Sequence, residues 1–142
     1  MSIAAASLTG CSGAVSLPDP SPTGESIQVC TALLGDLPTT VLENERRKAV
    51  PGRFSATWGD PPITLRCGVE KPPKLTATSE CFEVNGVGWF AEQTASGYLF
   101  TTIGRTTYVE VGVPSDYAPE ANALVDLAAA VSEHDPSLKP CI

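Results

Sequence analysis

The sequence is poor in the side chains that most enzymes use for acid–base and nucleophilic chemistry. It has a single histidine, His134, and it contains neither a G-x-S-x-G nucleophile elbow nor a glycine-rich phosphate loop. Its five cysteines include no C-x-x-C pair, which disfavours a zinc ribbon or a thioredoxin-type site. No apolar run approaches the roughly 20 residues that cross a bilayer. We therefore expect a non-enzymatic protein without a metal or cofactor.

Positive charge is also scarce. Nine Lys and Arg residues face sixteen Asp and Glu residues, which gives a net charge of −7 spread over 142 residues. This balance argues against nucleic-acid binding through a basic face. It fits a single acidic domain whose copies repel one another, so we expect a monomer.

Four cysteines, Cys30, Cys67, Cys81 and Cys141, are widely spaced and even in number. This arrangement predicts two disulfides and an oxidising, extracytoplasmic compartment. Three pairings are possible. We favour Cys67–Cys81, which would close the connection between two adjacent strands, and this leaves Cys30–Cys141 to join the two ends of the domain.

The fifth cysteine has a different context. Leu8-Thr9-Gly10-Cys11 resembles a bacterial lipobox, so we expect residues 1–10 to be the remnant of a lipoprotein signal peptide and Cys11 to be lipidated. A chance match is the alternative, because no Lys or Arg precedes the motif and the apolar stretch is short. Residues 12–26 are rich in Pro, Ser and Gly and predict a flexible tether from the outer face of the cell membrane to a domain at 27–142.

The domain begins and ends with helical patterns and has strand patterns between them. Strict alternation over Ile63–Val69 predicts a strand with one buried face, and Asn85-Gly86 predicts a hairpin. Ser26 would cap a first helix with an apolar face, and a second apolar stripe runs from Leu124 to Val131. We expect an α+β, two-layer sandwich in which two helices cover one face of an antiparallel sheet of about five to six strands.

Several residues could form a recognition surface, with arginines for carboxylates and aromatic rings for stacking. Three of them have a simpler structural interpretation as well: Arg66 neutralised by Glu110, Trp58 as a core residue, and Asp60 as a residue that forms a turn. The candidate binding surface comprises Trp58, Asp60, Arg66, Trp89 and Arg105.

Other chemistry has weaker support. Asp60, Glu83 and Glu110 could supply the two carboxylates of a glycan hydrolase, if two of them lie about 5–10 Å apart. His134 at the end of the last helix suits the helix dipole better than catalysis. Glu133, His134 and Asp135 could touch a metal ion, but adjacent residues rarely converge on one ion.

Four further stretches accompany the cysteine pattern: WGDPPITLRCGV at 58–69, VNGVGW at 84–89, FTTIGR at 100–105 and VEVGVP at 109–114. With the lipobox, they resemble a family of actinobacterial secreted proteins called domain of unknown function 3515. The resemblance covers about residues 27–141. It implies an exported envelope protein, typically a predicted lipoprotein, and it implies no activity and no catalytic residues.

Together these features lead to one functional expectation. We expect an exported, lipid-anchored envelope protein whose domain binds a protein partner. The alternative is a binding module for peptidoglycan or another cell-wall ligand, and a carboxylate-dependent envelope hydrolase is a more distant third.

Overall fold

A computed structural model describes residues 13–141 of the chain; residues 1–12 and 142 lie outside the described part. The predicted lipidation site, Cys11, is among the residues that are not described. In the described part no helix is both long and apolar enough to span a bilayer.

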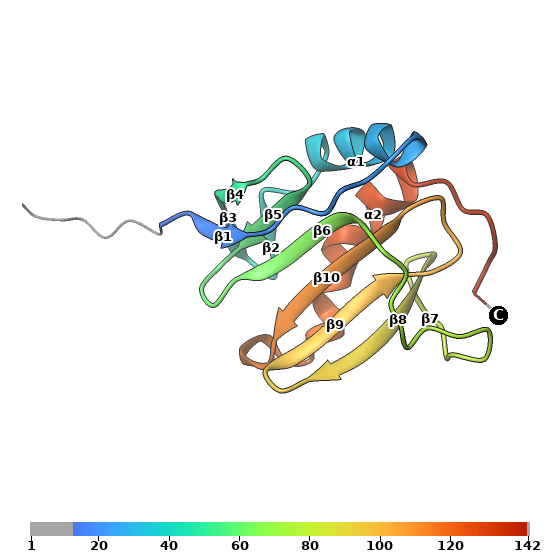
Figure 1. Cartoon of the computed structure of the whole chain (residues 1–142). Helices are drawn as coiled ribbons and strands as arrows, with labels where there is room; N and C mark the ends of the chain where they lie inside the picture. The colour runs from blue at the N-terminus through green and yellow to red at the C-terminus, as the bar shows by residue number, and fades with distance from the viewer. Residues whose placement is uncertain (1–12, 142) are drawn as a thin grey trace, which may run out of the picture.

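The described chain has ten strands, two α-helices and two short 3-10 helices (Figure 1). The strands are β1 (Val15–Leu17), β2 (Thr40–Val41), β3 (Asn44–Arg47), β4 (Ala49–Pro51), β5 (Ser55–Trp58), β6 (Ile63–Val69), β7 (Phe82–Val84), β8 (Val87–Thr94), β9 (Gly97–Thr102) and β10 (Tyr108–Pro114). The helices are α1 (Glu25–Gly35), η1 (Ser115–Tyr117), η2 (Glu120–Asn122) and α2 (Ala123–His134).

Eight strands form one antiparallel sheet in the order β2-β3-β5-β6-β10-β9-β8-β7, and β1 pairs with β4 in a small parallel sheet. The α+β class is confirmed, but the sheet is larger than the five or six strands expected. The extra strands β2 and β3 lie within residues 39–51, where the sequence shows no strand pattern. The strands there are short and carry several exposed charged side chains, so the stretch shows no regular alternation of apolar residues, although Val41 is fully buried.

Both helices pack on the same face of the sheet, as expected. The apolar stripe of α2 is buried, and α1 buries Val29, Cys30 and Leu33. The first helix begins two residues earlier than predicted, with Gly24 and not Ser26 at its N-cap. The Ser26 hydroxyl instead accepts a hydrogen bond from the Thr107 hydroxyl at 2.7 Å, so it ties α1 to the start of β10.

The two disulfides are Cys30–Cys67 and Cys81–Cys141, so the expected pairing of Cys67 with Cys81 and of Cys30 with Cys141 is wrong. The error came from treating the strands before and after residues 70–81 as neighbours. In the sheet, β10, β9 and β8 separate β6 from β7. Cys67 on β6 instead lies beneath α1 and bonds to Cys30, and Cys81 meets the C-terminal segment.

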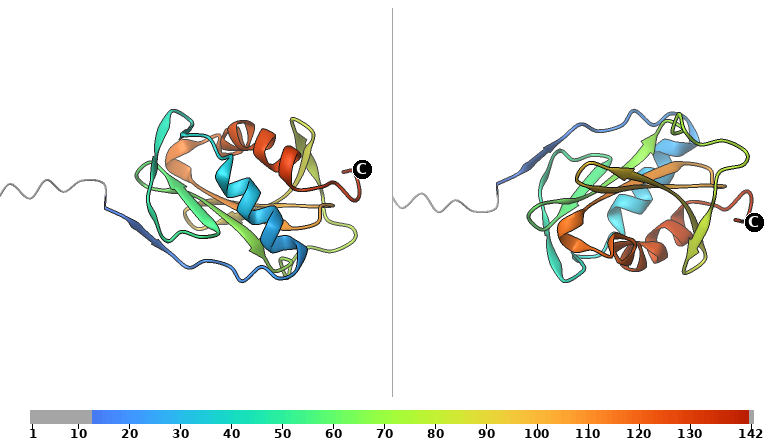
Figure 2. Two further views of the ribbon diagram at one scale, coloured as in Figure 1. Left: turned by 90° about the horizontal axis from the view of Figure 1, so that it is seen from above. Right: turned by 90° about the horizontal axis from the view of Figure 1, so that it is seen from below.

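The N-terminal segment is the second departure from expectation. Residues 13–24, called here the strap, run along the sheet on the side opposite α2 (Figure 2). Val15, Ser16 and Leu17 pair with Ala49, Val50 and Pro51. The tether predicted for residues 12–26 is therefore wrong for its described part, because a Pro- and Ser-rich composition does not reveal that a segment packs against a neighbouring sheet.

Candidate functional site

The face of the sheet opposite the helices, called here the outer face, carries a row of polar side chains. Arg66 points to this face because it alternates with the fully buried Leu65 and Cys67 along β6. Glu110 on β10 lies directly opposite Arg66, and Thr101 on β9 lies directly opposite Glu110. The sequence alternation in β6 thus places a charged row across the middle of the sheet.

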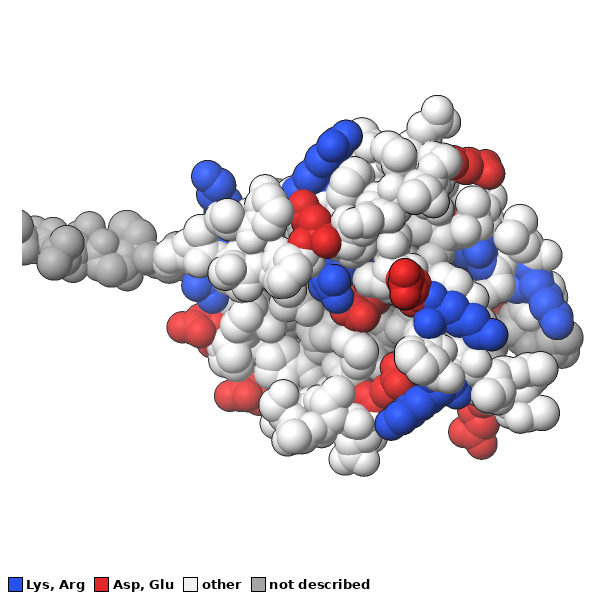
Figure 3. Space-filling model, in the orientation of Figure 1, with Lys and Arg blue, Asp and Glu red and all other residues white. Residues whose placement is uncertain are grey.

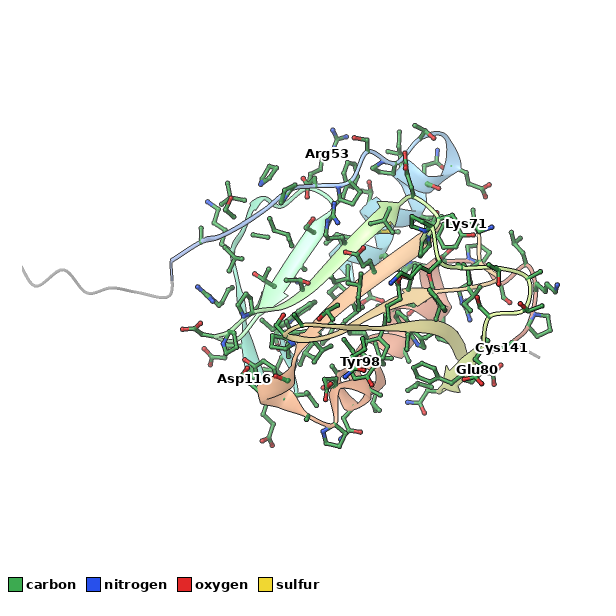
Figure 4. All side chains as sticks on the ribbon, turned by 60° about the horizontal axis from the view of Figure 1, so that its bottom comes forward. Arg53, Lys71, Glu80, Tyr98, Asp116 and Cys141 are labelled. Atoms are coloured by element: carbon green, nitrogen blue, oxygen red, sulfur yellow. A yellow bond between two sulfur atoms is a disulfide. The ribbon has the colours of Figure 1, made fainter. Side chains whose placement is uncertain are left out.

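Two irregular segments turn this row into a groove. The strap forms one wall, and the loop that follows β6, residues 70–73, forms another. Figure 4 shows Lys71 on that loop, projecting beside the sheet. The groove encloses a cavity of about 550 Å³. Its lining includes Asp19, Arg66, Glu70, Lys71, Glu92, Thr101 and Glu110.

Arg66 is fixed at the base of the groove. Its Nη1 donates to Glu110 Oε1 at 3.2 Å, and its Nε donates to the carbonyl oxygen of Pro18 in the strap at 3.0 Å. Both charged side chains are mostly buried, with 28% and 18% of their side-chain surface exposed. The expectation that Glu110 neutralises Arg66 is confirmed. Arg66 therefore joins the strap to the sheet, and its Nη1 and Nε are already used in these hydrogen bonds.

Asp19 holds the strap wall in a similar way. Its Oδ2 accepts a hydrogen bond from the backbone N–H of Arg53, and its Oδ1 accepts from the N–H of Phe54 and from the Ser55 hydroxyl. Close packing adds to these bonds at Gly68, where φ is +92° and a Cβ atom would lie 2.5 Å from Pro22. These hydrogen bonds and this packing hold the strap wall of the groove in place.

Two polar side chains that line the groove from β8 and β9 have no partner within residues 13–141. The Thr101 hydroxyl is buried, with 1% of the residue exposed, and makes no hydrogen bond there. Glu92 on β8 is half-buried and makes neither a hydrogen bond nor an ion pair with a described residue. The register places Glu92 opposite Leu99, one row from Thr101. A buried hydroxyl without a partner is costly, and this marks the groove as the strongest candidate site.

The tryptophans predicted for the binding surface are not on a surface. Trp58 and Trp89 are both fully buried in the core on the helix side of the sheet. The simpler interpretation of Trp58 as a core residue is confirmed, and the proposed role of Trp89 in recognition is wrong. Trp58 Nε1 donates to the Pro38 carbonyl oxygen, so the core supplies its partner.

The other predicted residues lie apart from Arg66. Asp60 is in the turn between β5 and β6 with 89% of its side chain exposed, 3.9 Å from Arg47. Arg105 donates to the carbonyl oxygens of Asp135 and Gly86 at 2.7 and 3.1 Å, so it fastens the C-terminal segment. The structure does not bring Trp58, Asp60, Arg66, Trp89 and Arg105 together, and of these five residues only Arg66 lines the groove.

The structure does not bring Glu83 and Glu110 together as a carboxylate pair. Glu83 lies on the edge strand β7, three strands from Glu110 on β10, or about 14 Å at ordinary strand spacing. That separation exceeds the range for a pair of glycosidase carboxylates. His134 Nε2 lies 2.9 Å from Asp36 Oδ2, where it links the C-terminal ends of α1 and α2. A histidine in that position is explained by its hydrogen bond with Asp36.

A three-residue acidic and histidine cluster differs from the one considered from the sequence. Asp36, Glu133 and His134 have ligand atoms within 4.8 Å of one another, on the surface of the helix layer. Asp135 does not join them, because its side chain is fully buried. Exposed acidic groups of this kind are common without an ion, so we assign none to this cluster.

Asp135 is the strongest electrostatic anomaly in the described chain. Burial raises the pKa of its carboxyl group to about 6, against the lowering effects of hydrogen bonds from the loop before β10 and of the Arg105 charge. Its Oδ1 accepts from the N–H of Thr107 at 3.0 Å, and Oδ2 has no partner among the described residues. It does not line the groove, so its role is to join the end of α2 to β10.

Sequence reasoning missed the most informative residues of the groove, Thr101 and Glu92. A threonine in a β-rich run and a glutamate near a strand end are ordinary in sequence. Their importance comes from the cross-strand register and from the covering strap. The one sequence signal for the groove was the charge of Arg66 on the polar face of the alternating strand β6.

Comparison with known protein families gives one match. Residues 3–139 match the family described as "Protein of unknown function (DUF3515)". The chain belongs to the DUF3515 family. No curated protein and no solved structure matches the chain. Membership of DUF3515 confirms the resemblance drawn from the sequence motifs, and it assigns no activity, so the function must be argued from the groove.

Proposed function

We propose that this DUF3515 protein is an exported, lipid-anchored envelope protein that acts by binding and not by catalysis. In this proposal Cys11 carries the anchor, and the groove on the outer face receives an extended segment of a protein partner. Two disulfides support export, because such bonds persist in oxidising compartments and are rare in the cytosol.

The observation that carries the proposal is the groove itself. Its strap wall is fastened by Asp19 and Arg66, and its floor holds the unpartnered Thr101 hydroxyl. Such a groove has the shape and polarity of a site that takes a polar, narrow ligand. Figure 3, which views this side of the molecule, shows acidic and basic side chains interleaved with no large patch of one sign.

The rest of the described surface offers less to a partner. The exposed large apolar residues are single side chains on α1, β4, α2 and the C-terminal segment: Ile27, Val50, Val125 and Leu138. Apolar residues scattered singly are normal on a monomer and do not mark an interface. A broad hydrophobic interface therefore has less support than insertion of a peptide into the groove.

A cell-wall peptide is the second candidate ligand. The groove carries both signs of charge, with Lys71 and Arg66 beside Glu70 and Glu92. The stem peptides of peptidoglycan carry both carboxylates and amino groups, so mixed charge suits them as well as it suits a protein segment. Binding of isolated muropeptides to the purified chain would favour this candidate over a protein partner.

Site-directed photo-cross-linking in native membranes tests the proposal. A photoreactive residue at Lys71, which is exposed and lines the groove, should give a discrete adduct. The same residue at Glu133, exposed on α2, is the matched control. An adduct at position 71 that disappears in the Thr101→Val variant supports the proposal. Equal adducts at both positions, or none at position 71, would overturn it. A diacylglyceryl mass on the Cys11 peptide would be read in the same experiment.

A further inference from the structure

The groove contains acceptors that no residue within 13–141 uses. Thr101 Oγ1 is buried and has no hydrogen-bond partner among these residues. Glu92 has no ion-pair partner among the described residues. Glu110 Oε1 accepts a hydrogen bond from Arg66, and the other carboxylate oxygen of Glu110 accepts none from a described residue. A cluster of carboxylates alone would not indicate a ligand site, but here the buried Thr101 hydroxyl, which no described residue bonds, lies among them.

The register brings these three side chains close to one another. Glu110 and Thr101 are directly opposite across β10 and β9, and Thr101 and Phe90 are directly opposite across β9 and β8. Glu92 is two residues further along β8, on the same face, so it is a diagonal neighbour of Thr101. Directly opposite residues have Cβ atoms about 5 Å apart, and diagonal neighbours lie about 7–8 Å apart. Long glutamate side chains can close such distances around one small group.

The charges of the groove favour a cation over an anion. Four carboxylates, Asp19, Glu70, Glu92 and Glu110, line it together with two cations, Arg66 and Lys71. Arg66 is occupied by Glu110 and by the Pro18 carbonyl oxygen. The acceptors that remain are carboxylate oxygens and a hydroxyl, and a primary ammonium group offers three N–H donors and no acceptor.

We infer that the part of the groove bounded by Glu92, Thr101 and Glu110 binds the primary ammonium group of a peptide ligand, such as that of a lysine or other diamino side chain. This assignment rests on the proposed function, since it names the chemistry of the ligand for the same groove. The ammonium group would give one hydrogen bond to each of the three side chains. These bonds are charge-assisted with Glu92 and Glu110 and are stronger than neutral ones.

Titration of the full chain with two capped tripeptides tests the inference. Acetyl-Ala-Lys-Ala-amide carries the ammonium group, and the analogue with norleucine has the same chain length without it. Backbone amide chemical shifts of β8, β9 and β10 report binding in the groove. We expect the lysine peptide to bind at least tenfold more tightly than the norleucine peptide. Glu92→Gln and Thr101→Val should each weaken its binding several-fold, and Glu83→Gln, on the exposed edge strand, should not.

Three results would overturn the assignment. The first is that the lysine peptide shifts no outer-face amide at the highest concentration used. The second is that both peptides bind equally, and the third is that binding survives Glu92→Gln and Thr101→Val unchanged. These failures can be separated from failure of the proposed function. Cross-linking from position 71 reports whether the groove meets a partner, whatever the charge of that partner. Equal binding of both peptides would keep the groove as a binding site and remove only its preference for a cation.

Discussion

The carboxylate of Asp19 accepts a hydrogen bond of 2.7 Å from the hydroxyl of Ser55, although 36 residues separate them in the sequence. The same carboxylate accepts from two backbone N–H groups, so one side chain fastens the strap to the start of β5. This attachment gives the groove its wall, and it brings the expected lipid anchor close to the domain.

Replacing Asp19 with alanine should release the strap. The N–H groups of Arg53 and Phe54 and the hydroxyl of Ser55 would lose their acceptor, which should cost about 1–3 kcal/mol in the free energy of unfolding. Urea denaturation measures the loss, and hydrogen exchange should quicken over residues 13–23. Ser21→Ala, also in the strap but exposed, is the control and should leave both unchanged. Unchanged exchange in Asp19→Ala would show that packing alone holds the strap.

The Cys30–Cys67 bridge should be the more informative of the two disulfides to remove. It joins α1 to β6 across 37 residues, and both cysteines are fully buried. In the chain-entropy model, opening a loop of this length lowers the free energy of unfolding by about 4 kcal/mol. The double variant Cys30→Ala/Cys67→Ala should therefore unfold at much lower urea concentration.

Peptide mapping without reduction checks the connectivity itself. It should recover Cys30 linked to Cys67 and Cys81 linked to Cys141. Peptides that link Cys67 to Cys81 would show that the sequence-based pairing was right and the structure wrong. Free thiols at all four positions would argue against export.

The stability of the protein should depend on the protonation of Asp135. An aspartate ordinarily has a pKa of 3.8, and burial raises that of Asp135 to about 6. Between these values the folded chain keeps a proton that the unfolded chain has released. The free energy of unfolding should therefore fall, through this group, as the pH rises from about 4 to about 6, and the loss should be complete above that range.

Asp135→Asn should remove this contribution, because the amide stays neutral and its oxygen can still accept from the Thr107 N–H. Melting temperatures at pH 4.5 and 7.5 test it. Relative to the parent chain, Asp135→Asn should gain stability at the higher pH more than at the lower. Glu133→Gln, two residues earlier and exposed, should show no such difference. A parallel response of the parent and Asp135→Asn would mean that the buried carboxyl is already ionised at pH 4.5.

Local signals in the sequence were sufficient for the central part of the fold. Alternation gave the bounds of β6 correctly, and Asn85-Gly86 marked the β7–β8 turn, where both residues adopt positive φ. These features depend on contacts within one element or one hairpin. The disulfide pairing depends on the order of strands across the sheet, which no local pattern specifies, so the strand order had to be seen before Cys67 could be matched to Cys30.

The candidate site shows the same limit. Arg66 and its neutralisation by Glu110 followed from alternation and from the charge balance of an acidic chain. The groove could not be predicted in this way. It depends on the strap, whose composition predicts a flexible segment, and on Thr101, whose hydroxyl is removed from water only when the sheet and strap have formed. Trp89 is an error of the opposite kind. Its place beside a hairpin led us to assign it to recognition, but it is fully buried.

The attachment of the strap leads to a last prediction, about the membrane. Only residues 12–14 separate Cys11 from β1, so a lipidated Cys11 would hold the β1–β4 end of the domain beside the bilayer. Three exposed basic residues lie in or directly after β3 and β4: Arg46, Lys48 and Arg53. Each Lys or Arg near an anionic surface contributes about 1 kcal/mol of attraction. The C-terminus lies at the opposite end (Figure 1).

Lipidated protein in phosphatidylglycerol vesicles that contain a photoactivatable lipid headgroup should be labelled mainly within residues 44–53. Labelling there should fall in Lys48→Gln/Arg53→Gln and at high salt, since screening weakens attraction between exposed charges. Lys139→Gln, at the other end of the domain, is the control and should not change it. Labelling spread evenly over the domain would mean that the strap does not hold the domain against the bilayer. If residues 13–24 were released, the domain could move roughly 20 Å or more from the membrane and rotate freely.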